Sequence, residues 1–123
     1  MLPGSHRLRR SADFAAVVRR GARKGRRTMV VHAHVDSSPV RVGGPRFGLI
    51  VSKSVGDSVT RHRVSRRLRH LAAELITELE PADDLLVVIR ANKAAVTASH
   101  ADLRRDLRTG LTSATERARE ETR

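Results

Sequence analysis

The residues best able to do chemistry in this chain are a group of closely spaced cations. They are Arg61, His62, Arg63, Arg66, Arg67 and Arg69, and no acidic residue interrupts them. A guanidinium group is a planar fork of donors that matches the oxygens of a phosphate, so such a cluster is suited to binding phosphates. It offers no nucleophile or general base, so the chemistry it indicates is recognition of a polyanion.

A helix must hold these cations. Val64, Leu68, Leu71 and Leu75 recur at i, i+4, i+7 and i+11, which predicts one apolar stripe on a helix from about Ser58 to Glu80. Asp57 or Ser58 is suited to cap its start. The helix is therefore expected to be fixed to a core on one side and cationic over the rest of its surface.

Charge and composition favour a nucleic-acid partner. The chain has 123 residues, with 25 Lys and Arg against 13 Asp and Glu, for a formal charge of +12. Such an imbalance indicates a polyanionic partner, nucleic acid before an anionic membrane surface. There is no cysteine and no apolar run long enough to cross a bilayer. With Phe14 and Phe47 as the only aromatic residues, the aromatic signature of an RRM is missing. Nothing indicates a catalytic residue or a metal ligand, because the acids and the histidines, including His32 and His34, lack the spacing of such sites.

The remaining elements fit one α+β domain. A first helix is expected over Ala12–Arg20, capped by Ser11 and ended by Gly21. A last helix is expected after Ser99, with an apolar stripe of Leu103, Leu107 and Leu111. Strands are expected over Thr28–Asp36, Arg46–Lys53 and Leu85–Arg90, with a loop from Ser37 to Pro45. Residues 112–123 have no apolar stripe and are predicted to be frayed or disordered. The prediction is a single domain over residues 1–111, a two-layer sandwich of order α-β-β-α-β-α. Its strand–helix–strand crossover should be right-handed by general rules.

Two blocks of sequence resemble a known family. The order Ser-Lys-x-x-Gly-x-x-Val-x-Arg-x-Arg-x-x-Arg over Ser52–Arg66 resembles the signature of the bacterial ribonuclease P protein subunit. Arg-Leu-Arg-Arg-Ser-x-Asp-Phe at Arg7–Phe14 and Arg-Arg-Gly at Arg19–Gly21 are similar to its opening segment. The resemblance covers about residues 5–111.

The resemblance implies a function. The family's protein binds a large catalytic RNA and helps it to remove the 5′ leader of precursor tRNA. The RNA performs the hydrolysis, and Mg²⁺ is held mainly by the catalytic RNA and the substrate. We therefore expect a cytoplasmic subunit of an endoribonuclease, inactive alone, with the catalytic RNA and precursor tRNA as partners and with no membrane or protein partner. The resemblance also implies a left-handed crossover, against the general rule.

The family's site residues carry over position by position. Arg61, Arg63, Arg66 and Arg69 match its basic helix, and with His62 and Arg67 they form the expected RNA-binding set. Phe14 matches a leader-contacting aromatic residue and Lys53 a strand-end lysine. Val18 stands where a second Phe is common and His32 where a Tyr is common, and these four form the expected leader cleft. His62, Ser65 and Asp57-Ser58 also depart from the family pattern, where Asn, Lys and Asn-Ala are usual.

Two other functions fit the composition. The first is a noncatalytic RNA-binding protein of ribosomal-protein type, which need not carry the blocks Arg7–Gly21 and Ser52–Arg69 in order. The second, weaker, is a DNA-binding helix module, which would want Asn or Gln on its basic face to read base edges. The predicted helix has neither there.

Overall fold

The computed structural model describes residues 7–36, 45–78 and 84–121. Along the chain, the elements are α1 (Ser11–Arg20), β1 (Ala22–Gly25), β2 (Met29–Val35), β3 (Arg46–Ile50), the 3-10 turn η2 (Lys53–Val55), α2 (Ser58–Leu75), η3 (Ile76–Glu78), β4 (Leu85–Ala91), η4 (Lys93–Val96) and α3 (His100–Glu121). The mixed α+β prediction is confirmed. The expected loop residues 37–44 lie outside the described residues, as do residues 79–80 of the expected long helix. The α-helix itself ends earlier than expected, at Leu75, and continues as the 3-10 turn η3.

The described strands form one sheet in the order β1-β2-β4-β3. β1 pairs antiparallel with β2, β2 pairs antiparallel with β4, and β3 pairs parallel with β4. Strand β1 was not predicted, because its four residues Ala-Arg-Lys-Gly show no apolar alternation. An isolated bridge from Arg7 to Phe47 adds the N-terminal segment to the β3 edge.

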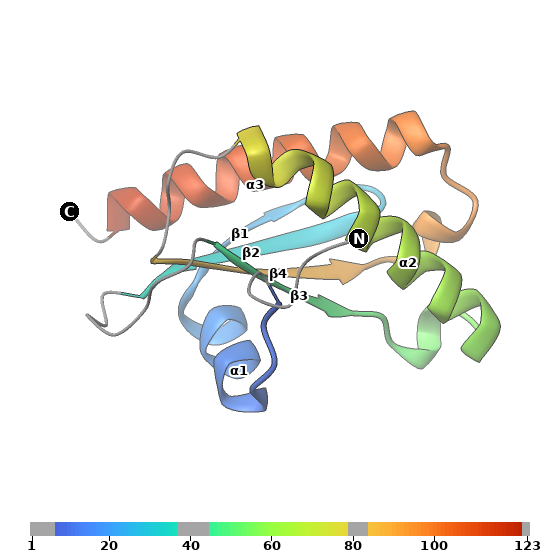
Figure 1. Cartoon of the computed structure of the whole chain (residues 1–123), viewed down its shortest axis with the longest axis horizontal. Coiled ribbons are helices and arrows are strands. Elements are labelled where there is room, and N and C mark those ends of the chain that lie inside the picture. The colour runs from blue at the N-terminus through green and yellow to red at the C-terminus, as the bar shows by residue number, and fades with distance from the viewer. Residues whose placement is uncertain (1–6, 37–44, 79–83, 122–123) are drawn as a thin grey trace.

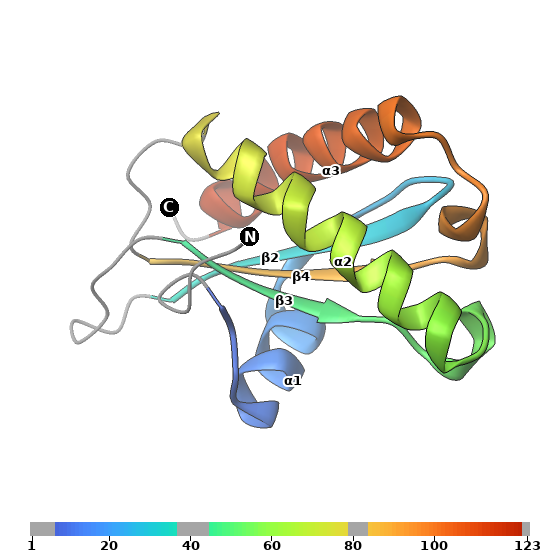
Figure 2. The same ribbon diagram turned by 45° about the vertical axis from the view of Figure 1, so that its right-hand side comes forward.

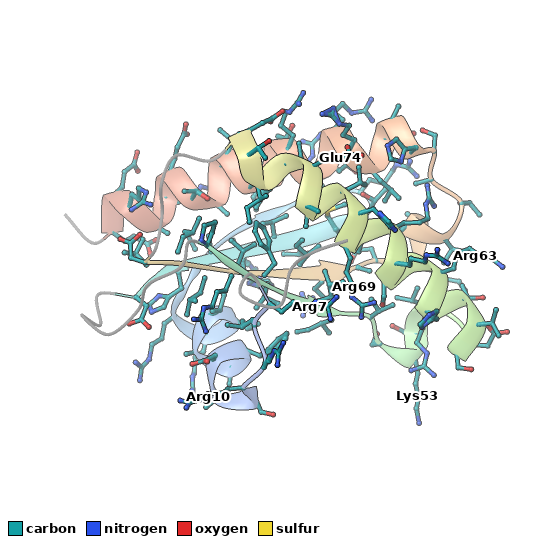
Figure 3. All side chains as sticks on the ribbon, viewed as in Figure 1. Arg7, Arg10, Lys53, Arg63, Arg69 and Glu74 are labelled. Carbon is teal, nitrogen blue, oxygen red and sulfur yellow. The ribbon has the colours of Figure 1, made fainter. Side chains whose placement is uncertain are left out.

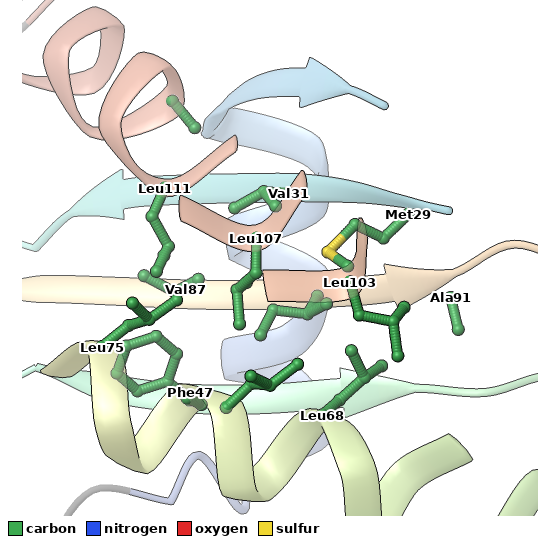
Figure 4. Close-up of a cluster of buried hydrophobic side chains, with 14 of the residues drawn as sticks. Met29, Val31, Phe47, Leu68, Leu75, Val87, Ala91, Leu103, Leu107 and Leu111 are labelled. Atoms are coloured by element: carbon green, nitrogen blue, oxygen red, sulfur yellow. The ribbon is translucent and has the colours of Figure 1, made fainter. Parts of the chain in front are cut away.

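The β3–α2–β4 crossover is left-handed. Seen from the helix side with both strands pointing right, β3 (green) lies below β4 (tan) and α2 crosses in front of them (Figure 4). A right-handed connection seen this way would move downward from the first strand to the second. The general expectation was wrong and the resemblance was right. Given this strand order, a right-handed crossover would place α2 on the sheet face that α1 occupies.

The main core lies between the sheet and the pair α2 and α3 (Figure 4). Alternate residues of the central strands point into it, among them Met29 and Val31 from β2 and Val87 and Ile89 from β4, all fully buried. The predicted α2 stripe of Val64, Leu68, Leu71 and Leu75 is buried in the same cluster. Burying each such side chain contributes about 1.5–3 kcal/mol, so this stripe fixes which side of α2 remains outside.

Helix α1 covers part of the opposite sheet face, as Figures 1 and 2 show. The structure therefore adds a third, partial layer to the predicted sandwich. Leu8 and Val17 pack there against Leu86 and Val88 of β4. Gly48 permits this approach, because a Cβ at that position would collide with the Phe14 ring.

Helix α3 runs through most of the segment expected to be frayed. It continues to Glu121, and Ala114 and Ala118 are buried in the main core. The prediction of a frayed tail was therefore wrong over 112–121, and residues 122–123 lie outside the described part. The apolar stripe of Leu103, Leu107 and Leu111 continues in alanines, which a search for large apolar residues overlooks.

Capping explains where two of the helices begin. The Asp57 carboxylate accepts a hydrogen bond from the Thr60 backbone N–H at 2.8 Å, so Asp57 caps α2 rather than Ser58. The Ser99 hydroxyl accepts a hydrogen bond from the Asp102 backbone N–H at 3.1 Å at the start of α3. Helix α1 instead starts one residue earlier than expected, with Arg10 at the cap position and no side-chain cap. None of the helices in the described ranges is both long and apolar enough to cross a membrane.

Candidate RNA interface

Most cations of α2 lie away from its buried stripe, whereas Arg61 lies beside the stripe and its Nε is buried. We call Arg61, His62, Arg63, Arg66 and Arg69 the α2 basic face. His62, Arg63 and Arg66 are exposed, whereas Arg61 and Arg69 are half-buried. Figure 3 shows Arg63 and Arg69 on α2 and Arg7 on the N-terminal segment. The helix therefore presents the predicted set of cations as one surface, with the exception of Arg67.

The ion pairs between described residues gather on α3. Each of the following pairs includes a residue of that helix: Arg26–Asp106, Arg27–Asp102, Arg104–Glu74, Arg104–Glu78, Arg105–Asp102, Arg108–Glu78 and Arg119–Asp84. Within the described ranges, no acid pairs with the arginines of the α2 basic face. Four arginines of α3 are thus paired inside the protein, whereas the exposed side chains of the α2 basic face remain available to an external anion.

Arg67 has a structural role. Its guanidinium donates to the backbone carbonyl of Ala98 at 2.8 Å and to that of Ala95 at 3.4 Å. These bonds hold α2 against η4 and the start of α3. The prediction that Arg67 serves RNA binding like its neighbours needs this correction, because helix periodicity turns it toward η4.

Asp57 places one negative charge beside the α2 basic face. The backbone hydrogen bond from Thr60 lowers the pKa of Asp57, and Arg61 and Arg63 lower it further. The carboxylate is therefore ionised at neutral pH. It stabilises the start of the helix and partly neutralises the arginines that follow.

The expected leader-cleft residues fall into three environments. Phe14 and Val18 are half-buried on the side of α1 that packs against the sheet, next to Ile50 of β3. Lys53 is exposed on η2, and Figure 3 shows it projecting below the first turns of α2. The structure thus brings Phe14 and Val18 together and places Lys53 at the start of α2.

His32 does not line an open cleft. It is 2% exposed, and within the described part neither ring nitrogen has a hydrogen-bond partner. Burial lowers the pKa of His32, and the charges of Arg90 and Arg23 lower it further. Strand alternation places His32 on the α1 side of the sheet with Val30, where it is buried rather than open to a ligand.

Three cations on the α1 side of the sheet were not predicted from the sequence. Strand register pairs Arg23 of β1 with His32, and Arg90 of β4 lies opposite Val30. Arg46 of β3 shares that side with Gly48 and Ile50 by alternation. In the described part none of the three forms an ion pair. In the sequence, each of these arginines stands at a position of its strand that points away from the main core. Only the pairing register of the strands shows that the three lie on the same side of the sheet.

Comparison with known proteins identifies the family. The family model described as Ribonuclease P matches residues 2–115. The chain is 56% identical over 116 residues to the ribonuclease P protein component of Rhodococcus erythropolis, covering 91% of this chain and 90% of that protein. It is 50% identical over 114 residues to that of Mycobacteroides abscessus, covering 90% and 88%.

Solved structures agree at the level of the fold. A Staphylococcus aureus RNase P protein mutant superposes with a TM-score of 0.77 at 22% identity, covering 90% of this chain and 89% of that one. The RNase P protein from Thermotoga maritima gives 0.70 at 18% identity, with 84% and 92% covered. Sequence and fold agree over nearly the whole chain, which therefore belongs to the ribonuclease P protein family.

Proposed function

We propose that this protein is the subunit of ribonuclease P that holds the catalytic RNA and the 5′ leader of precursor tRNA, and so promotes removal of the leader. The α2 basic face would bind backbone phosphates of the catalytic RNA. The uneven distribution of ion pairs is the observation that carries this proposal. In the described part of the chain, the arginines of the α2 basic face form no ion pair, whereas Arg104, Arg105 and Arg108 of α3 are paired with acids.

The leader would lie along the α1 side of the sheet. Phe14 offers a partly exposed ring for stacking against a base. The exposed Arg23 and Arg90 would meet its phosphates, and Lys53 would lie where this surface reaches α2. Because Val18 and the buried His32 provide no second aromatic face, charge would contribute a larger share of leader binding here.

The chemical step would belong to the RNA. Within the described ranges, no three His, Asp or Glu side chains come together as a metal site. The acids near the cations serve instead as caps and ion-pair partners, as Asp57 and Glu78 do. The proposal therefore has Mg²⁺ held by RNA and substrate phosphates, and the protein acting by binding and orienting them. Its place of action would be the cytoplasm, where tRNA precursors are processed.

The family assignment favours this function over a ribosomal-type RNA-binding protein. It also explains why the two sequence blocks occur together, since one supplies α1 and the other η2 and α2.

Salt-dependent RNA binding tests the proposed interface. We expect Arg63→Ala with Arg66→Ala to weaken binding to a bacterial ribonuclease P RNA. The slope of log K against log salt should fall by about 0.7–0.9 for each phosphate that the variant no longer neutralises. The matched control is Arg104→Ala with Arg108→Ala, which removes the same charge from α3, where both arginines are paired. Equal reductions in affinity and slope in the two double variants would contradict a localised interface.

A further inference from the structure

Val59 stands out on the α2 basic face. It is 67% exposed, and in the described part of the chain it is the one large hydrophobic side chain in that state. A single exposed apolar residue is ordinary on a protein surface. The unusual feature is its position among cations that form no ion pair in the described part of the chain. Charged side chains there hold water, whereas Val59 exposes methyl groups to it.

Helix geometry places Val59 among three cations of this face. At about 100° per residue, Arg66 points within about 20° of the same direction, and Arg63 and His62 lie about 40° and 60° to either side. Arg66 is about 10 Å further along the axis at 1.5 Å per residue. All three neighbours are exposed, so an RNA that reaches their side chains also covers Val59.

We infer that Val59 packs against the face of an unpaired nucleobase of the catalytic RNA, an inference that rests on the proposed function. Base faces are the largest apolar surfaces that RNA offers. In a duplex they are stacked and covered, whereas in loops and bulges they are open. A phosphate or a 2′-hydroxyl against Val59 would lose water without gaining a hydrogen bond. The arginines thus hold the backbone on either side, and Val59 selects a site where a base is turned outward.

The test separates an apolar interaction from a charge interaction. We expect Val59→Ala to bind a bacterial ribonuclease P RNA about fivefold to tenfold more weakly, because fewer methyl groups are buried against the base. The salt slope should stay unchanged, because the variant neutralises the same number of phosphates. Val59→Thr, which keeps the shape but replaces a methyl with a hydroxyl, should also weaken binding, and Val59→Ile should retain it.

The controls use the exposed position of the residue. Val59 takes no part in the buried core, so circular dichroism and urea unfolding should report an intact fold for all three variants. Thr112→Ala, a similar truncation on the exposed side of α3, should leave RNA binding unchanged. A fully paired RNA duplex should bind Val59→Ala and the unsubstituted protein equally well.

Two results would overturn the inference. One is wild-type affinity of Val59→Ala for the ribonuclease P RNA, and the other is an equal decrease in affinity for that RNA and for the duplex. In either case, a lower salt slope for Arg63→Ala with Arg66→Ala would leave the proposed function standing. An unchanged slope in that double variant would instead remove α2 from the RNA interface.

Discussion

The buried imidazole of His32 makes the stability of this protein depend on pH. Because burial, Arg90 and Arg23 lower the pKa of His32 in the folded protein, the unfolded chain binds the proton first as the pH falls. The contribution of His32 to stability is therefore complete above its unfolded pKa, near 6.5, and declines below it. At pH 5.5 this decrease has a ceiling of about 1.4 kcal/mol, which is the free energy of protonating the unfolded imidazole at that pH.

The variant His32→Leu removes this proton-binding group. It also removes two ring nitrogens that have no partner in the described part of the chain. Each buried polar group without a partner costs about 1–3 kcal/mol, so the variant should be more stable than the parent at pH 8. The difference should widen as the pH is lowered to 5.5.

Urea unfolding of both proteins between pH 8 and pH 5.5 measures this difference. Because other titrating groups are common to both, subtracting the two curves isolates His32. Arg23→Gln should reduce the pH dependence, since one of the charges that repels the imidazolium is gone. A parallel decline of stability in the parent and in His32→Leu would contradict this expectation, because it would mean that the folded protein accepts the proton as readily as the unfolded chain.

Three further predictions concern RNA binding and the crossover. Phe14→Ala should weaken binding of precursor tRNA to the holoenzyme more than binding of mature tRNA. Phe14→Leu, which keeps an apolar side chain in the packing of α1, is the control. Equal weakening for both RNAs would count against a leader contact. Asp57→Asn should keep the helix cap, since Asn caps as well as Asp. It should raise affinity for ribonuclease P RNA, because it removes a carboxylate that lies close to Arg61 and Arg63. An affinity equal to that of the parent would place the RNA away from the first turn of α2. Arg67→Gln should lower the free energy of unfolding by about 1–2 kcal/mol, because the Ala95 and Ala98 carbonyls lose a charged donor; unchanged stability in urea would show that these bonds are not structural.

Sequence periodicity was sufficient for α2. The stripe from Val64 to Leu75 predicted which side is buried, and so which side carries the cations. Periodicity cannot tell a cation facing solvent from one facing a neighbouring element. Arg67 shows this limit, because its partners are backbone carbonyls about thirty residues away, and backbone groups carry no sequence signal.

The features that were not predicted have physical causes as well. Ala114 and Ala118 of α3 are buried in the main core, as the leucines of α2 are. Alanine contributes little to an apolar sequence pattern, so this part of α3 was not recognised. A side chain at Gly110 would collide with Val31, so a residue that weakens helix propensity is there for close packing. The sheet face carrying Arg23 and Arg90 required the register of strands remote in sequence. The handedness of the crossover came from the family resemblance, against the general rule.

Removal of the 5′ leader from a precursor tRNA at low Mg²⁺ is the most direct test of the proposed function. The assay compares a bacterial ribonuclease P RNA alone, this protein alone, and the two together. We expect no cleavage by the protein alone and strong stimulation of cleavage when it joins the RNA, with the stimulation reduced in Arg63→Ala with Arg66→Ala. Tight binding to a cognate RNA without any change in leader removal would contradict the proposed function and leave only a generic RNA-binding protein.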